Sequence, residues 1–229
     1  MAPTEFVLRM SEILTPPELA AAVSAVEAPL ARKRPKPGER RAQILQALAA
    51  MLEQPGAERI TTAALAARLS VSEAALYRHF ASKAQMFEGL IDFIEQSVFT
   101  LLQQIVGREV PDAQSDAQAG TRQAARVVAV VLQFGERNPG MVRVMVGDAL
   151  VFENDRLQQR INQFFERIES TLRQCLRPVT AGSATPTVDA QVAASVLTAF
   201  VMGRLQRYAR SGFKRMPSEH LDASLALML

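Results

Sequence analysis

The amino-acid sequence predicts an all-α protein. Hydrophobic residues make up 48% of the 229 positions, but only 6% are aromatic and Trp is absent, a balance typical of helical globular proteins rich in Ala and Leu. Apolar side chains also recur at the helical period over long segments, as in the run Phe87, Leu90, Ile94, Val98. A short stretch near residue 70 adds two helix caps around a tight turn, which predicts a pair of small packed helices.

Residues 60–83, ITTAALAARLSVSEAALYRHFASK, contain this helix pair. Thr61 or Thr62 can cap the first helix and Ser72 the second, with a turn over residues 69–72 between them. Inward positions stand four apart, as one face of a helix requires: Leu65 and Leu69, then Leu76 and Phe80. The pattern predicts a helix-turn-helix.

The outer face of the second helix begins with small side chains and continues with larger polar ones: Ser72, Glu73, Ala74, Tyr77 and Arg78. Ala and Ser allow the backbone to approach base edges in a major groove, and Tyr and Arg reach sugar and phosphate oxygens. The alternative is two packed helices with an ordinary solvated surface. We favour binding to duplex DNA.

The next helix begins with Ser82 as its cap and Lys83 in its first turn. A cation at a helix N-terminus opposes the macrodipole, so this position calls for an anion. A DNA phosphate would satisfy both the lysine and the exposed backbone N–H groups.

The run TTAALAARLSVSEAALYRHFASK resembles the DNA-binding signature of TetR-type regulators. This resemblance implies a TetR-like fold, in which an N-terminal three-helix helix-turn-helix head is joined by a long helix to a C-terminal helical dimerisation domain. It also implies that Thr62, His79 and Lys83 hold the DNA backbone. One departure is Ser70, where the family usually has Gly; if the turn needs a positive φ there, Ser bears a strain of roughly 1 kcal/mol.

We expect three segments on this basis: a variable, flexible N-terminal extension (1–37), the DNA-binding domain (38–84), and the regulatory and dimerisation domain (85–229). Within the extension, residues 18–28 could form a short Ala-rich helix. The basic arm at residues 32–36 is either a solvated tail or a segment that follows the phosphate backbone. Residues 39–53 form an amphipathic support helix for the head.

Charge is distributed unevenly although the net charge is only +3. Residues 32–83 contain ten Lys or Arg against four acids, a balance of +6 that leaves −3 for the rest of the chain. The positive field therefore lies at the helix-turn-helix end, as attraction to a polyanion requires. A purely architectural nucleoid protein is disfavoured because it would need a larger nonspecific charge.

The remaining helices follow from their apolar periods. A long helix after Lys83 leaves Phe93 off its main stripe, either as a second core contact or as a partner anchor. After a loop at residues 107–118, the β-branched run at 122–136 suggests a strand, but its length and flanks favour a buried helix. Residues 134–140, FGERNPG, break that helix and place Arg137 and Asn138 at a corner, and a short helix follows to about residue 152.

Two apolar helices near the C-terminus predict a homodimer. One spans residues 155–176, with Cys175 on its buried stripe, and the other spans about 192–208, after a flexible loop at 177–188. A last short helix carries Leu221, Leu225 and Met228. Because one helix-turn-helix reads only half a site, pairing through these helices would give a reader of two half-sites.

Several function classes find no support in the sequence. His79 and His220 have no metal-ligand neighbours at suitable spacing, and no phosphate loop or nucleophile elbow is present. A lone Cys175 and the absence of a signal-like N-terminus or a long apolar run favour a cytoplasmic protein. We expect no enzyme, no metal, no cofactor and no membrane association.

Segments beyond the head resemble one branch of the TetR-type family, the nucleoid occlusion factors, in FGERNPGMVRVMVGDALVFENDRLQQRINQFFERIE and GRLQRYARSGFKRMPSEHLDA. These are dimeric DNA binders of the nucleoid that antagonise polymers of the division GTPase FtsZ. The resemblance implies that Phe93, Arg137 and Asn138 contact the FtsZ tail. The competing hypothesis is a ligand-responsive repressor, although we expect no small-molecule effector.

Overall fold

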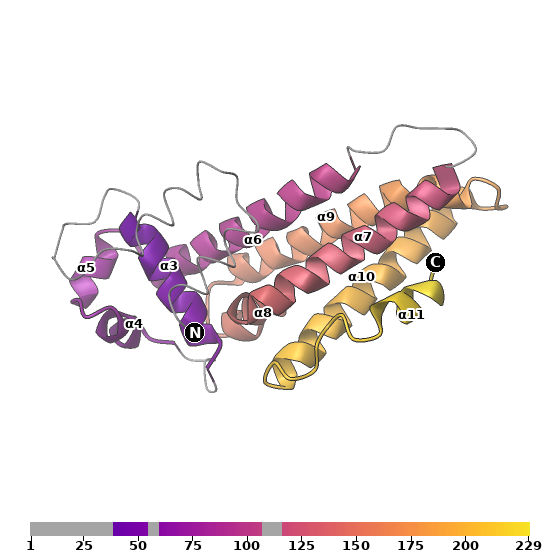
Figure 1. Cartoon of the computed structure of the whole chain (residues 1–229). Coiled ribbons are helices and arrows are strands. Elements are labelled where there is room, and N and C mark those ends of the chain that lie inside the picture. Colours follow the sequence, from indigo (N-terminus) through magenta and orange to yellow (C-terminus); the bar gives the residue numbers. More distant parts are fainter. Residues whose placement is uncertain (1–38, 55–59, 107–115) are drawn as a thin grey trace.

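Three short helices form a head at one end of the molecule (Figure 1). The computed structural model describes residues 39–54, 60–106 and 116–229, and every regular element within these ranges is helical. The head consists of α3 (Glu39–Leu52), α4 (Thr62–Arg68) and α5 (Glu73–Tyr77). The buried side of α3 carries Ile44, Leu48 and Leu52, which confirms the predicted support helix. The expected N-terminal helix and basic arm lie outside the described residues.

A long helix, α6 (Lys83–Val106), runs from the head into the body, as the sequence predicts (Figure 1). Its buried stripe contains Phe87, Leu90, Ile94, Val98 and Leu102. Because one continuous helix carries core residues of both parts, the head has no flexible linker at this junction. The predicted boundary at residue 84 therefore falls inside the first turn of α6.

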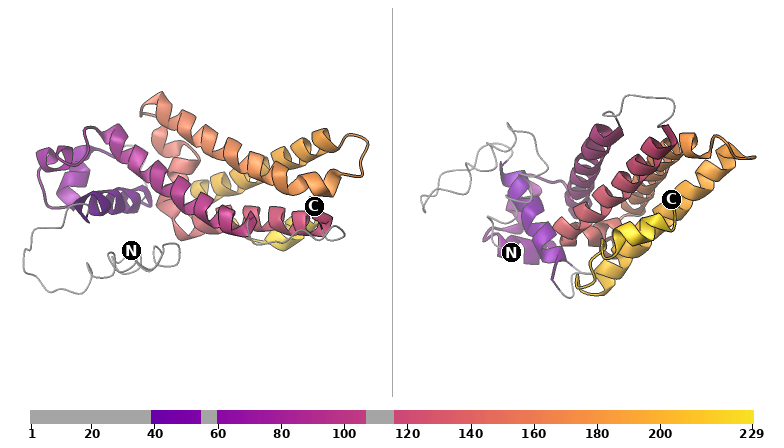
Figure 2. Two further views of the ribbon diagram at one scale, coloured as in Figure 1. Left: turned by 90° about the horizontal axis from the view of Figure 1, so that it is seen from above. Right: turned by 45° about the vertical axis from the view of Figure 1, so that its right-hand side comes forward.

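The body is a stack of long helices, α6, α7 (Asp116–Arg137), α9 (Asp155–Thr180) and α10 (Pro186–Arg210) (Figure 2). Helix α9 packs against the other three, and all eight apolar residues of its predicted stripe are buried, including Cys175. A short terminal helix, α11 (Leu221–Ala226), is tied to α10 because Arg204 donates to the Glu219 carbonyl and the Ser224 hydroxyl, each at 2.8 Å.

Helix α7 is longer at both ends than the sequence predicted. It begins at Asp116, inside the expected loop at 107–118, and continues through residues 134–137 rather than breaking there. Gly135 is compatible with the helix because its lack of a side chain makes room for Leu205: a Cβ atom would lie 2.6 Å from that side chain. The break comes only at Asn138 and Pro139, where the proline cannot continue the hydrogen-bond ladder.

The predicted flexible loop at 177–188 is wrong. Helix α9 continues to Thr180 with Pro178 inside it, and α10 already begins at Pro186. The Thr180 hydroxyl makes contacts with the Leu176 carbonyl at 3.3 Å and the Pro186 carbonyl at 2.8 Å, so it joins the two helix ends. A proline near the end of a helix removes only one backbone donor, so α9 can continue past it.

Helix α8 (Pro139–Met145) and the 3₁₀ turn η2 (Asp148–Leu150) replace the single short helix expected to about residue 152. Helix α8 packs on α3 of the head. Gly140 makes this close approach possible: a Cβ atom there would lie 2.1 Å from the Ala49 carbonyl oxygen. The corner at residues 134–140 therefore docks the body onto the head.

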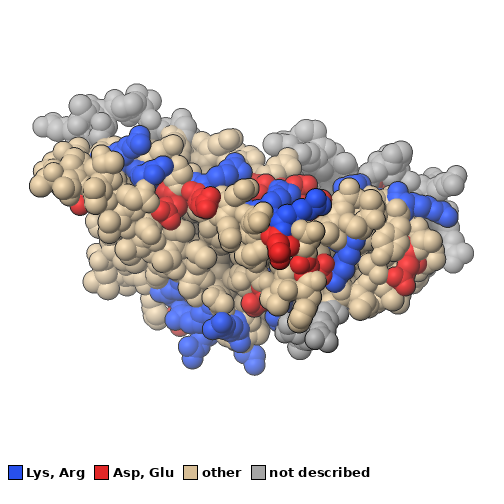
Figure 3. Space-filling view, turned by 180° about the vertical axis from the view of Figure 1, so that it is seen from behind, with Lys and Arg blue, Asp and Glu red and all other residues tan. Residues whose placement is uncertain are grey.

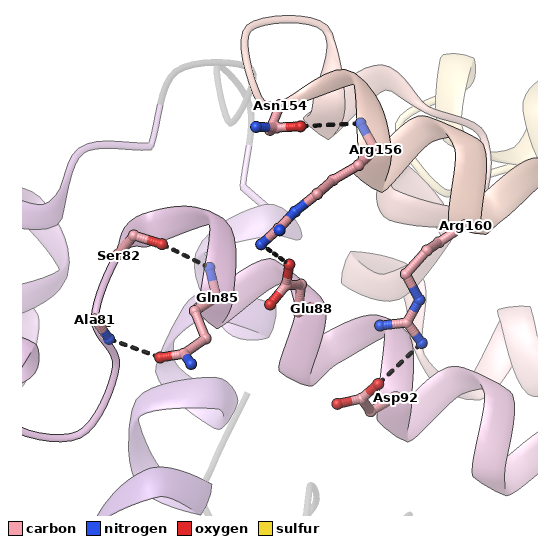
Figure 4. Close-up of polar contacts among 8 residues, drawn as sticks. All are labelled: Ala81, Ser82, Gln85, Glu88, Asp92, Asn154, Arg156 and Arg160. Atoms are coloured by element: carbon pink, nitrogen blue, oxygen red, sulfur yellow. Dashed lines mark hydrogen bonds and ion pairs between the residues drawn. The ribbon is translucent and has the colours of Figure 1, made fainter.

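Ion pairs join α9 to α6 near the head (Figure 4). Arg156 pairs with Glu88, and Arg160 pairs with Asp92 at 2.9 Å and Glu95 at 2.7 Å. Burial lowers the pKa of Arg160, but hydrogen bonds to both carboxylates outweigh it, so the pKa is raised overall. Seen from behind, acidic and basic side chains lie next to one another along the body (Figure 3).

Candidate nucleic-acid interface

The helix-turn-helix forms as the sequence predicts. Thr61 caps α4, its side-chain oxygen accepting from the Ala64 N–H at 3.1 Å, and Ser72 caps α5, accepting from the Ala75 N–H at 3.3 Å. The inward residues Leu65, Leu76 and Phe80 are each about 1% exposed. Both short helices are thus held by one cap and one buried stripe, since helices of this length are marginal alone.

Ser70 has a positive φ, which is the condition for backbone strain at this residue. Its φ is 53°, in the left-handed region, and the turn closes through the N–H groups of Ser70 and Val71, which donate to Ala67 and Ala66. A left-handed φ is costly for any residue other than Gly, so the serine bears the expected strain.

The outer face of α5 is open to solvent. Ser72, Glu73, Ala74, Arg78 and His79 are exposed, and Tyr77 is 45% exposed despite its large ring. The five residues predicted from the second helix therefore share one surface, together with His79. Among the described residues, no group of His, Cys, Asp and Glu side chains is placed to hold a metal ion, and neither His79 nor His220 belongs to one.

Thr62 links this face to the start of α4. The Thr62 hydroxyl donates to the Glu73 carboxylate at 2.6 Å. The Tyr77 hydroxyl lies 3.5 Å from the Thr62 hydroxyl oxygen. Three of the predicted contact residues thus form a connected polar group, which fixes two side chains of α5 that would otherwise rotate freely in solvent.

Arg41 supports the end of α5, a role that sequence reasoning missed. Its guanidinium donates to the His79 carbonyl at 2.9 Å and lies 4.2 Å from the centre of the Phe80 ring. An Arg near the start of an amphipathic helix has no local partner in the sequence. Its target is 38 positions away, so only the fold reveals the contact.

The start of α6 has the predicted cap but a different anion. Ser82 accepts from the Gln85 N–H at 3.2 Å, and the Gln85 side chain accepts from the Ala81 N–H at 2.6 Å (Figure 4). The Lys83 ammonium lies 2.5 Å from the Glu153 carboxylate. The Lys83 charge, which was expected to pair with a DNA phosphate, is therefore balanced by Glu153, just before α9.

Two of the three residues expected to bind a partner, Phe93 and Asn138, contact Phe134. Phe93 is half-buried, and its ring lies 6.4 Å from that of Phe134. Arg137 ends α7 with an exposed side chain. Asn138 is only 6% exposed, and its side-chain amide donates to the Phe134 carbonyl at 2.9 Å. Arg137 and Phe93 therefore offer surface, whereas Asn138 holds the corner in place.

A hollow of about 470 Å³ lies between α6 and α9, on another part of the body. Phe99, Leu102 and Val106 supply its apolar lining, and Arg167 stacks 3.7 Å from the centre of the Phe99 ring.

Two family models match the chain. Residues 44–90 match the bacterial regulatory proteins of the tetR family, and residues 120–229 match the tetracyclin repressor-like, C-terminal domain of the SlmA-like type. The nucleoid occlusion factor SlmA of Photobacterium profundum is 53% identical over 190 residues, which cover 82% of this chain and 92% of that protein. The chain belongs to the SlmA branch of the TetR family. SlmA of Klebsiella pneumoniae is 47% identical over 201 residues, 87% of this chain and 98% of that protein.

Solved structures agree with this family at the level of the fold. The TetR-family regulator PfmR from Thermus thermophilus superposes with a TM-score of 0.64 at 21% identity, over 82% of this chain and 97% of that one. FadR from Bacillus subtilis, solved with stearoyl-CoA, gives 0.62 at 15% identity, over 82% and 96%. Membership of the TetR family confirms that the protein is a DNA-binding regulator and not an enzyme.

Proposed function

We propose that this protein is a cytoplasmic nucleoid occlusion factor, which binds chromosomal DNA sites as a dimer and there inhibits FtsZ polymers. The observation that carries the proposal is the identity of about one half to SlmA proteins over more than nine-tenths of their length. Relatives that share only the TetR fold would not extend to the C-terminal body at this identity.

The outer face of α5 enters the major groove in this proposal. Ser72 and Ala74 let the backbone approach the bases, and Tyr77 and Arg78 contact sugar and phosphate. Thr62, His79 and Lys83 hold the backbone on either side. A phosphate near the start of α6 must then compete with Glu153, which lies 2.5 Å from the Lys83 ammonium.

The dimer forms through the outer face of α10. Val188, Val192, Val196 and Met202 are between 45% and 59% exposed. The three valines recur every four residues along one side of the helix. The apolar stripe at residues 157–176 is buried within one protomer, so the predicted contribution of that helix to the dimer would have to come from its exposed side. Helix α10 has the length and hydropathy of a membrane span. In this proposal the helix is so apolar because one of its faces packs in the core and the other packs in the dimer.

FtsZ binds at the surface around Phe93 and Arg137. A half-buried aromatic ring supplies apolar contact, and an exposed guanidinium can pair with a carboxylate of an acidic tail. Asn138 contributes by fixing the corner, through its bond to the Phe134 carbonyl.

Sedimentation of FtsZ polymers tests the proposal. With GTP and operator DNA, the wild-type protein should lower the pelleted fraction of FtsZ. Arg137→Asp should abolish this effect at unchanged operator affinity, whereas the matched variant Arg122→Asp, an exposed residue earlier in α7, should retain it. Unaltered FtsZ pelleting by the wild-type protein, or full activity of Arg137→Asp, would contradict the proposal.

A ligand-responsive repressor is the second candidate, supported by the hollow between α6 and α9. Mapping the bound chromosomal sites separates the two functions. Many scattered sites that avoid the replication terminus would support occlusion, and a few promoter sites would support repression.

A further inference from the structure

Glu73 is an acidic residue on a surface that would face a polyanion. It is the first residue of α5 and is exposed. Among the residues that the structure describes, no Lys or Arg side chain forms an ion pair with it. A carboxylate so placed repels phosphates, and a base that donates a hydrogen bond to it would offset that repulsion in a DNA complex.

The position of this carboxylate is fixed. Thr62 donates to Oε2 of Glu73 at 2.6 Å, and Thr62 is itself 3.5 Å from the Tyr77 hydroxyl. The other oxygen, Oε1, accepts from no described residue. The side chain therefore presents one oriented acceptor on the outer face of α5, and an ionised carboxylate carries no donor of its own.

The four bases differ in whether their major-groove edges can donate a hydrogen bond to such a carboxylate. Guanine presents two acceptors, and thymine an acceptor and a methyl group, so both oppose a carboxylate. Adenine presents a donor next to the N7 acceptor, whereas cytosine presents only the N4 amino donor. Because a single acceptor without a donor matches cytosine best, we infer that Glu73 reads a cytosine in each operator half-site through its N4 amino group. Thr62 acts as the positioning residue.

This inference rests on the proposed DNA binding and can fail separately from it. An operator selected from random duplexes is first used to identify the cytosine in question, by replacing each cytosine in turn with 2-pyrimidinone, which lacks the 4-amino group. One replacement per half-site should weaken binding roughly 5- to 150-fold, with the salt dependence unchanged because no phosphate contact is lost. The same replacement should have no effect on the Glu73→Gln variant.

Two further variants make the test specific. Glu73→Gln should shift the preferred base at that position from cytosine to adenine, since an amide matches the adjacent donor and acceptor of adenine. Thr62→Val keeps the shape of the side chain and should reduce the preference for cytosine although Glu73 is present. Glu166→Gln, which removes an exposed acid of α9, is the matched control and should leave the preference intact.

The outcomes are distinct. If no cytosine is sensitive to loss of its amino group, or if Glu73→Gln keeps the wild-type base preference, the inference is overturned while operator binding stands. If selection yields no preferred sequence at all, the proposed DNA-site recognition fails as well.

Discussion

Gly140 of α8 packs directly against the backbone of Ala49 in α3. A Cβ atom at position 140 would lie 2.1 Å from the Ala49 carbonyl oxygen and 3.0 Å from its carbon. Backbone cannot move aside as a flexible side chain can, so any larger residue must push α8 away from the head. This contact explains why a glycine follows the Asn-Pro corner.

Gly140→Ala should therefore destabilise the protein, by about 1–3 kcal/mol as for other overpacked contacts. Urea unfolding followed by circular dichroism measures the loss. Gly182→Ala is the matched control, because nothing lies within 4 Å of a Cβ there. Equal stability of the two variants would show that α8 does not depend on this approach.

Ser70→Gly should stabilise the protein by roughly 0.5–1 kcal/mol. The substitution removes the cost of a left-handed φ of 53°, less the entropy that glycine adds to the unfolded chain. Ser70→Ala retains the strain and should bring no gain. Thermal unfolding of both variants checks this, and a gain in the alanine variant would mean that the hydroxyl, not the φ angle, is unfavourable.

Lys83→Ala should weaken binding to every DNA sequence and reduce the slope of log K against log salt by about 1, because one phosphate contact is lost. Glu153→Gln should do the opposite and strengthen binding, since it releases Lys83 from its ion pair. Fluorescence anisotropy over a series of salt concentrations measures both. A change in base preference with an unaltered salt slope would refute the phosphate contact.

Asn138→Ala should destabilise the fold by about 0.5–1.5 kcal/mol, because it removes the side-chain hydrogen bond to the Phe134 carbonyl, which then keeps only the Asn138 backbone N–H as a donor. It should weaken FtsZ binding only as far as the corner is disturbed, whereas Arg137→Asp should abolish binding at a smaller cost in stability, chiefly from an acid at the C-terminus of α7. Isothermal titration with an FtsZ tail peptide, alongside unfolding, distinguishes the two roles. Strong loss of binding in a fully stable Asn138→Ala variant would make Asn138 a direct contact.

Val192→Glu should convert the dimer into a monomer with intact helices, since it places a charge on the apolar outer face of α10. Val151→Glu is the control: Val151 is 71% exposed but lies outside α10. Sedimentation velocity at micromolar concentration, without DNA, measures the state of each. A Val192→Glu protein that still sediments as a dimer would place the interface elsewhere.

Local chemistry determined what the sequence alone could predict. Caps at Thr61 and Ser72, the turn at Ser70 and the apolar stripes of α6 and α9 depend on residues within a few positions of one another, and each formed as predicted. The outer face of α5 followed as well, because the inward residues Leu76 and Phe80 leave only one side to solvent.

Tertiary structure decided the contacts between residues that are distant in the chain. Nothing near Lys83 predicts Glu153 as its partner, and nothing near Asn138 or Gly140 indicates that one is buried and the other touches Ala49. The continuation of α9 past Pro178 and the exposure of one apolar face of α10 were also decided at this level. Apolar periodicity marks a face as suited to burial, but which partner covers it depends on how the helices pack, and that is a property of the whole chain.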